Sequence, residues 1–195
     1  MSKRLYVAYG SNLNIGQMSH RCPNARLYGT GVIEDYELQF KGSSTSAFAT
    51  IAPKEGSTVP VAVWEIDKMD EKFLDHYEGY PSHYFKRDVP VKLEDQNVTA
   101  MVYIMNLKME FGMPSSYYYR IVHNGYTDCG LDTKFLDQAL LDSAKQYYAA
   151  AMTPRSQLKM SDDKDIDSEV EEIESIEAEL EETDSSFGTI PMCGL

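Results

Sequence analysis

Short apolar runs alternate with polar or glycine-containing turns through the first half of this 195-residue chain. The run Leu-Tyr-Val-Ala-Tyr at residues 5–9 is continuous, which is typical of a strand buried on both faces. Further strands are predicted at residues 25–28, 33–40, 47–52, 59–66, 84–93 and 98–104. The intervening turns are expected at residues 29–31, 53–56 and 94–97, which are rich in glycine, proline and polar side chains.

Helical spacing marks the segment that follows Asp67. Asp67 suits the N-cap position, and Asp70 and Glu71 place negative charge in the first turn, where the helix dipole favours it. Gly79 and Pro81 are expected to end this helix. Its apolar face is predicted to comprise Met69, Phe73, Leu74 and Tyr77.

Three other helical segments are predicted, at residues 15–20, 115–124 and 133–151. The second is expected to stop at Gly125 and the third before Pro154. Several strands come first and helices follow, without the βαβ alternation of a doubly wound sheet. The pattern therefore predicts the α+β class.

The composition changes sharply from about residue 161. Residues 161–184 hold 13 acidic side chains and one lysine, so most of the net charge of −13 lies there. Apolar residues recur in this segment at spacings of three and four, which predicts an acidic amphipathic helix through Ile166, Val170, Ile173, Ile176 and Leu180. Repulsion among the acids weakens such a helix in isolation. We therefore expect a domain at residues 1–155 and an acidic, partly helical or disordered tail at residues 156–195.

The rest of the chain is nearly neutral, with 18 acidic and 17 basic residues, and offers no basic face to a nucleic acid. No window approaches the apolar length of a membrane span, and residues 1–4 lead directly into a strand rather than into an apolar signal region. We expect a cytoplasmic protein with no membrane or nucleic-acid partner. The acidic tail offers a surface for a basic protein partner.

The segment Tyr9-Gly10-Ser11-Asn12-Leu13 is the leading candidate for chemistry. It follows a buried strand directly, Gly10 can adopt a positive φ, and small neighbours let a ligand approach the backbone. Successive backbone N–H groups in such a turn form a concave anion site. The alternative is a purely structural turn at the end of a strand.

Glu78 and Tyr118 are the next candidates. Glu78 follows a helix that otherwise buries apolar side chains, and contact with such a surface would raise the pKa of its carboxyl group and make it a usable base near neutral pH. The alternative is a solvated glutamate at a helix end. Three successive tyrosines occupy residues 117–119, of which one would point into any pocket that this helix borders.

The cysteines and histidines give no metal site. Three cysteines at wide spacing fit neither a disulfide framework nor a zinc site, and the histidines, His20, His76, His83 and His123, have no ligand spacing. In the tail, residues 163–174 place acids at several ligand positions of a calcium loop, but Ser168 stands where that loop needs glycine. We predict no metal and no cofactor.

The order and spacing of three motifs are informative. They are Tyr-Gly-Ser-Asn-Leu at residues 9–13, Glu-Gly at residues 78–79 and Pro-Ser-x-x-Tyr-x-x-Ile-x-x-x-Gly at residues 114–125. This order resembles the gamma-glutamylcyclotransferase family, and the segment Arg-Cys-Pro-Asn-Ala at residues 21–25 also looks like that family. The resemblance covers about residues 3–150. The residues Tyr-Pro-Ser-His-Tyr at 80–84 are closer to the bacterial and gamma-glutamylamine-type branch.

The resemblance implies a small mixed β-barrel with flanking helices. It implies that residues 9–13 hold a gamma-glutamyl head through backbone amides, with Glu78 as the catalytic glutamate and Tyr118 as the pocket tyrosine. It also implies a cofactor-free reaction, in which the α-amine of a gamma-glutamyl amine or gamma-glutamyl amino acid attacks its own γ-carbonyl and releases 5-oxoproline and the amine. The alternative is a non-catalytic small-molecule-binding or interaction protein on the same fold, recruited by its acidic tail.

Overall fold

The computed structural model describes residues 3–43, 46–106 and 108–152 of the chain. By its contacts the chain divides into two units, Met1–Ser156 and Gln157–Leu195, and the first unit holds all of the described residues. The acidic helix, the calcium-like tract and the surface for a basic partner were all predicted in the tail, which lies outside the described residues.

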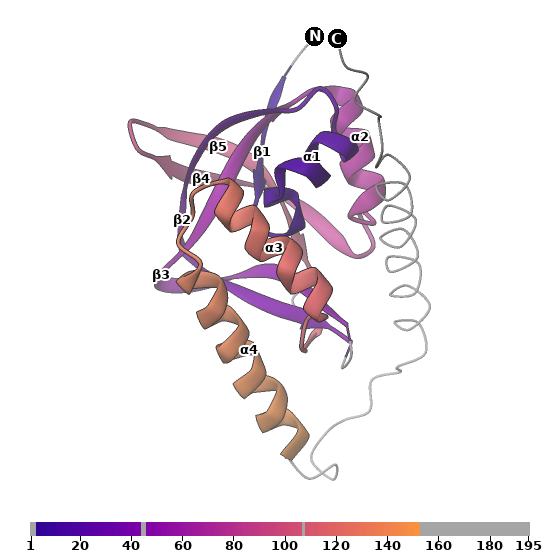
Figure 1. Ribbon diagram of the computed structural model, residues 1–195, viewed down its shortest axis with the longest axis vertical. Coiled ribbons are helices and arrows are strands. Elements are labelled where there is room, and N and C mark those ends of the chain that lie inside the picture. Colours follow the sequence, from indigo (N-terminus) through magenta and orange to yellow (C-terminus); the bar gives the residue numbers. More distant parts are fainter. Residues whose placement is uncertain (1–2, 44–45, 107, 153–195) are drawn as a thin grey trace, which may run out of the picture. The chain divides into compact units, whose positions relative to one another are not determined.

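Within the described residues, five strands form a closed β-barrel, which confirms the α+β class and the mixed barrel that the resemblance implies (Figure 1). The strands are neighbours in the order β3-β1-β5-β4-β2, and β2 pairs with β3 to close the barrel. β1 and β5 run parallel, and the other pairs are antiparallel. The strands are β1 (Arg4–Ala8), β2 (Arg26–Gly42), β3 (Ala47–Ile66), β4 (Tyr84–Leu93) and β5 (Asn97–Met105), with a short β6 (Glu110–Phe111) added to the end of β2.

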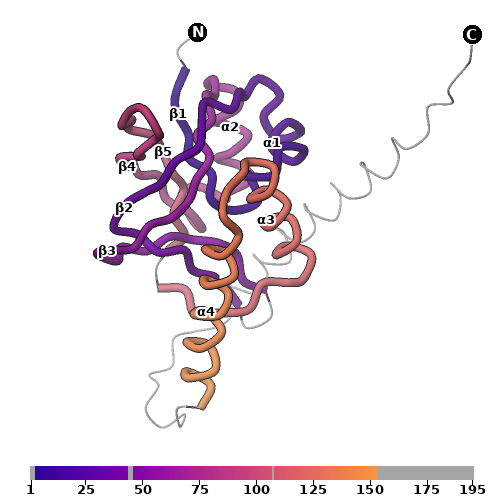
Figure 2. The backbone as a smooth tube through the Cα atoms, turned by 60° about the vertical axis from the view of Figure 1, so that its left-hand side comes forward, coloured from indigo at the N-terminus to yellow at the C-terminus, as the bar shows by residue number. Residues whose placement is uncertain are grey.

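Helices flank the barrel. A short 3₁₀ helix, η1 (Ser11–Leu13), and α1 (Ile15–Arg21) follow β1, and α2 (Lys68–Tyr77) joins β3 to β4. The later helices are α3 (Ser116–Asp128) and α4 (Lys134–Met152). Both Figure 1 and Figure 2 show α1 beside α3, and η1 packs directly on α3. No helix among the described residues combines the length and the apolar character that a membrane crossing requires.

β2 and β3 form one long hairpin, so two of the predicted turns are wrong. Residues 29–31 lie inside β2, and residues 53–56 lie inside β3. Gly31 allows a close approach where β2 meets β4: a Cβ on this residue would lie 2.3 Å from the main-chain oxygen of Lys92. The glycine therefore marks the place where β2 lies close to β4 and not a change of chain direction.

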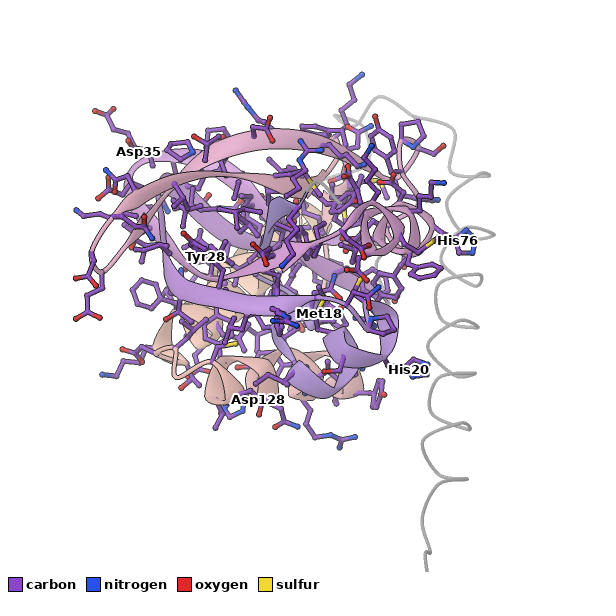
Figure 3. The ribbon with its side chains drawn as sticks, turned by 90° about the horizontal axis from the view of Figure 1, so that it is seen from above. Met18, His20, Tyr28, Asp35, His76 and Asp128 are labelled. Atoms are coloured by element: carbon purple, nitrogen blue, oxygen red, sulfur yellow. The ribbon has the colours of Figure 1, made fainter. Side chains whose placement is uncertain are left out.

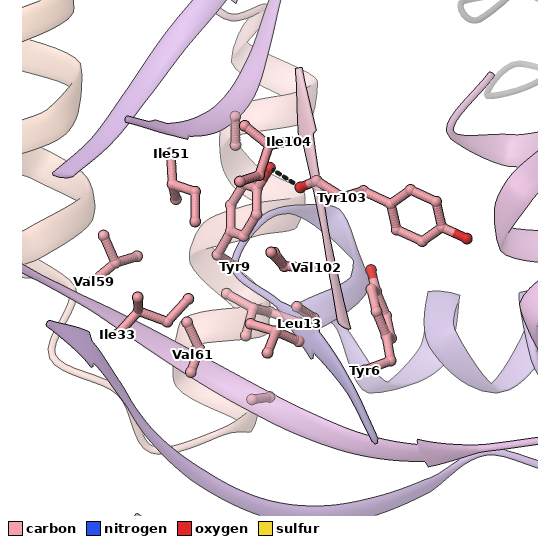
Figure 4. Close-up of a cluster of buried hydrophobic side chains, with 14 of the residues drawn as sticks. Tyr6, Tyr9, Leu13, Ile33, Ile51, Val59, Val61, Val102, Tyr103 and Ile104 are labelled. Carbon is pink, nitrogen blue, oxygen red and sulfur yellow. Dashed lines mark hydrogen bonds between the residues drawn. The ribbon is translucent and has the colours of Figure 1, made fainter. Parts of the chain in front are cut away.

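Branched and aromatic side chains fill the space between the strands (Figure 4). Alternate residues of a strand point to the same face, so each strand sends a row of side chains inward. The fully buried members include Val7, Ile33, Ile51, Val59, Val61 and Val102. Their close packing fixes the ends of the strands, from which the loops extend.

α2 begins and ends as predicted, but its apolar face is only partly buried. The side chain of Asp67 accepts hydrogen bonds from the amides of Met69 and Asp70, and the side chain of Asp70 accepts one from the amide of Asp67. Leu74 is fully buried, whereas Met69 and Phe73 are 52% and 48% exposed. The buried line runs through Asp70 and Leu74 because the Asp70 carboxylate is drawn inward to complete this cap.

α3 continues past Gly125, where the sequence predicted its end. Gly125 is buried, and a Cβ on it would lie 2.6 Å from the amide nitrogen of Asn14 and 2.6 Å from the Cβ of Leu13. The glycine therefore lets α3 approach the loop after β1. It does not cap the helix.

We predict that Gly125→Ala lowers the free energy of unfolding by about 2 kcal/mol, because overpacking against the loop outweighs the gain of roughly 1 kcal/mol that alanine brings to a helix interior. Urea denaturation measures the change. Asn124→Ala, at an exposed position of the same helix, is the control and should shift stability by less than about 0.5 kcal/mol. A Gly125→Ala protein as stable as the parent would contradict this contact.

Candidate active site

The loop after β1 is a single tight turn. The amide of Leu13 donates to the oxygen of Gly10 at 3.0 Å, and the amide of Asn14 donates to the oxygen of Ser11 at 3.0 Å. Within the described residues, no hydrogen bond engages the amides of Gly10, Ser11 and Asn12. Three successive N–H groups are therefore free to bind an anionic group.

Gly10 is required by close packing and not by its backbone conformation. Its φ is −113°, so this loop does not use the positive φ that a glycine can adopt. A Cβ on Gly10 would lie 3.1 Å from the hydroxyl oxygen of Tyr118 and 3.3 Å from the Cβ of Ala49. The absence of a side chain thus lets Tyr118 reach the loop.

Glu78 lies at the C-cap of α2, where its amide donates to the oxygen of Leu74 at 2.8 Å. Its side chain meets the loop. The Nδ2 of Asn12 donates to the Oε1 of Glu78 at 3.0 Å, although 66 residues separate the two in the chain. The fold therefore brings the predicted loop and the predicted carboxylate into direct contact.

Both groups line one pocket, whose atom-free space, open solvent at its mouth included, is about 310 Å³. Its wall contains residues 10–12, Glu78 and a ring of tyrosines, Tyr6, Tyr9, Tyr84, Tyr103 and Tyr118. Glu78 is the one acidic or basic side chain in this wall, so far as the described residues form it. A concave site with a few converging polar groups suits a small molecule.

The side chain of Arg21 stabilises the loop through hydrogen bonds to two of its side chains. Its side chain is buried, and its Nη1 donates to the Oδ1 of Asn12 at 2.8 Å and to the Oγ of Ser11 at 3.1 Å. The guanidinium also packs on the ring of Tyr77, 3.7 Å from its centroid, and Nη2 donates to the Tyr77 hydroxyl at 2.6 Å. Because Arg21 donates to the oxygen of the Asn12 amide, the NH₂ group of that amide must face Glu78.

Most of the predicted site residues lie together, and one does not. Tyr9, Gly10, Ser11, Asn12, Glu78 and Tyr118 line the pocket. Leu13 does not: its side chain is fully buried in the core, and its amide is used within the turn. The structure therefore does not bring Leu13 to the pocket wall with the other residues, because the chain has already turned inward at that residue.

Four of the pocket tyrosines are neutral near neutral pH. Burial raises the pKa of Tyr6, Tyr9 and Tyr84 far above the ordinary value, and the nearby charge of Glu78 adds to the effect. Burial also raises the pKa of Tyr103, whose hydroxyl donates to Asp75 at 2.6 Å. These side chains therefore act near neutral pH as hydrogen-bonding groups and not as bases.

The two cysteines that the structure describes and two of the histidines lie outside this chemistry. Burial raises the pKa of the Cys22 thiol to about 12 and that of Cys129 to about 11, so neither forms a nucleophilic thiolate near neutral pH. Figure 3 shows His20 and His76 at the surface, pointing away from the barrel.

Sequence reasoning missed Arg21 and five of the pocket residues, Tyr6, Val7, Ala49, Tyr84 and Tyr103. The tyrosines sit in strands where alternation alone marks them as core. Arg21 is visible only as part of the segment at residues 21–25 that follows the loop. Its role depends on a contact across the fold with Tyr77, which no local pattern reveals.

The motifs and the geometry recur in known proteins. The profile of the family described as gamma-glutamyl cyclotransferase, AIG2-like, matches residues 6–126. The gamma-glutamylcyclotransferase of Homo sapiens is 31% identical over 143 residues, which cover 69% of this chain and 76% of the human protein. The protein of the same name from Mus musculus is 28% identical over 152 residues, which cover 73% of this chain and 80% of the mouse protein.

Comparison with solved structures points to the same family. A gamma-glutamyl cyclotransferase superposes with a TM-score of 0.65 at 26% identity, covering 90% of this chain and 98% of that chain. The chain belongs to the gamma-glutamylcyclotransferase family, which confirms the resemblance and makes the protein an enzyme. Membership of an enzyme family favours the catalytic interpretation over the non-catalytic alternative, and the assignment to the gamma-glutamylamine-type branch stays a prediction.

We predict that Arg21→Lys lowers the free energy of unfolding by about 2 kcal/mol, because lysine keeps the charge but cannot donate to Ser11, Asn12 and Tyr77 together. Chemical denaturation measures the loss. The matched control is Arg26→Lys, at an exposed position, which should change stability by less than about 0.5 kcal/mol. Equal unfolding midpoints for Arg21→Lys and the parent would show that the planar arrangement of the guanidinium donors is unimportant for stability.

Proposed function

We propose that the enzyme converts a gamma-glutamyl amine or gamma-glutamyl amino acid to 5-oxoproline and releases the amine. The observation that carries this proposal is the hydrogen bond from Asn12 to Glu78, which joins the amide-rich loop and a carboxylate in one pocket. The name shared by the relatives is consistent with such a reaction.

The loop suits the glutamyl head of the substrate. The free amides of Gly10, Ser11 and Asn12 can bind its α-carboxylate. Glu78 can receive the α-ammonium group, since a carboxylate attracts a cation and this carboxylate already lies beside the loop. Holding both ends of the head folds the substrate so that its own amine approaches its own γ-carbonyl.

The reaction is an exchange of one carbon–nitrogen bond for another. The α-nitrogen loses a proton to Glu78 and attacks the γ-carbonyl carbon, which closes a five-membered lactam ring. The bond from that carbon to the leaving nitrogen then breaks. The two protons lost by the α-nitrogen end on the departing amine, which leaves as an ammonium ion, and Glu78 carries them in turn. No water is consumed and no electrons are exchanged.

Two effects account for the rate. Holding the amine against the carbonyl contributes several kcal/mol, because the translational and rotational entropy has been lost on binding. Proton transfer through a positioned carboxylate contributes roughly a hundredfold or more. Since the substrate supplies the nucleophile, the reaction asks for no serine, thiolate, metal or cofactor from the protein.

The leaving amine is assigned only to a class. The pocket wall has no described cationic side chain that would pair with the carboxylate of a leaving amino acid. The residues at 80–84 resemble the gamma-glutamylamine-type branch, whereas the human and mouse relatives are gamma-glutamylcyclotransferases. Both kinds of substrate therefore belong in the test.

We predict that a panel of gamma-glutamyl amines and gamma-glutamyl dipeptides contains at least one compound that the full chain converts to 5-oxoproline, measured by chromatography and mass spectrometry. Glu78→Gln should lower kcat by about a hundredfold or more, and KM should rise because the neutral amide no longer attracts the α-ammonium group. Glu94→Gln, an exposed change in the β4–β5 turn, is the control and should leave kcat unchanged.

Two outcomes would overturn the proposal. One is a folded protein that forms 5-oxoproline from none of these compounds. The other is a Glu78→Gln protein with the turnover of the parent, since the proposed step has no other carboxylate within the described pocket wall to carry the protons.

A further inference from the structure

Most of the tyrosine hydroxyl groups around the pocket already donate to the protein. Tyr9 donates to the main-chain oxygen of Tyr103 at 2.7 Å, as the dashed line in Figure 4 shows. Tyr84 donates to the main-chain oxygen of Ala49 at 3.2 Å, and Tyr103 donates to the Oδ1 of Asp75 at 2.6 Å. The hydrogens of these three hydroxyl groups are therefore not available to a ligand.

Tyr6 differs from these three. Its hydroxyl oxygen accepts a hydrogen bond from the Nδ2 of Asn12 at 2.8 Å, and among the described residues no acceptor lies within reach of its own hydrogen. The residue is 3% exposed and lines the pocket. A buried hydroxyl donor without an acceptor is unfavourable in a folded protein and calls for an explanation. A ligand in the pocket supplies the missing acceptor.

The position of this donor is defined by the same amide that holds Glu78. The Nδ2 of Asn12 donates both to Tyr6 and to Glu78, so the two oxygens lie about 5 Å apart, because the N–H bonds of one amide group diverge by about 120°. Burial raises the pKa of Tyr6 well above its ordinary value, so the hydroxyl keeps its proton near neutral pH. Tyr6 is therefore a donor beside the catalytic carboxylate.

We infer that the hydroxyl of Tyr6 donates a hydrogen bond to the γ-carbonyl oxygen of the substrate as that oxygen becomes an oxyanion. This inference rests on the proposed function. In the tetrahedral intermediate, the entering nitrogen, the leaving nitrogen and the oxyanion are all bonded to one carbon. Glu78 exchanges protons with both nitrogens and so lies against them. The oxyanion, two covalent bonds from each nitrogen, then falls within reach of a donor about 5 Å from the carboxylate.

The test is Tyr6→Phe in the full chain, assayed with a substrate that the parent enzyme turns over. Loss of one oxyanion donor should lower kcat about 10²–10³-fold, with KM changed by less than about threefold, because the interaction forms only in the transition state. The control is Tyr126→Phe. Tyr126 is also fully buried with an unpaired hydroxyl but does not line the pocket, so this variant should keep the parental kcat.

The outcomes separate this inference from the proposed function. Turnover by the parent enzyme supports the proposed function whatever Tyr6→Phe does. A Tyr6→Phe enzyme with a kcat within about twofold of the parent overturns the inference. A raised KM at unchanged kcat also overturns it, since that result places the hydroxyl on a group bound equally in the ground state, such as the α-carboxylate.

If Tyr6→Phe does not fold, 3-fluorotyrosine incorporated at position 6 keeps the ring and the hydroxyl but makes the phenol more acidic. A changed kcat at constant KM then supports the inference, and parental kinetics overturn it.

Discussion

The side-chain amide of Asn12 is the link on which the site depends. It accepts from Arg21 on one side and donates to Glu78 and Tyr6 on the other. This single group therefore sets the positions of the loop, the carboxylate and a pocket hydroxyl relative to one another. The oxygen and the NH₂ group of this buried amide are both engaged, which favours a single arrangement and so organises the site in advance of binding.

The fold supports that link from several directions. Gly125 lets α3 pack against the backbone at Leu13 and Asn14, and Arg21 joins the loop to α2 through Tyr77. Gly10 lets Tyr118 approach from α3. The barrel itself supplies a rigid base, since β1, which leads into the loop, lies between β3 and β5. The loop has little freedom, so binding a substrate there costs little ordering entropy.

Local patterns in the sequence predicted much of the fold. Short apolar runs separated by polar segments located the strands, and Asp67 with Asp70 located the start of α2. Both patterns depend on interactions among residues that are close in the sequence. Gly31 and Gly125 were misread as chain breaks, since a glycine that allows a close approach looks in sequence like a glycine that turns. Motif resemblance led to Glu78 and the loop. The contacts of Tyr6 and Arg21 with Asn12 could not be predicted, because they arise only when distant elements meet.

Amide NMR of the ¹⁵N-labelled full chain, titrated with 5-oxoproline, tests the central claim most directly, since the product retains the carboxylate that the loop is proposed to bind. The account predicts that the largest chemical-shift changes occur at the amides of Gly10, Ser11 and Asn12. The amide signal of Gly56, which donates to Asp35 and lies outside the pocket wall, should not shift. Binding that leaves the three loop amides unshifted would contradict the account.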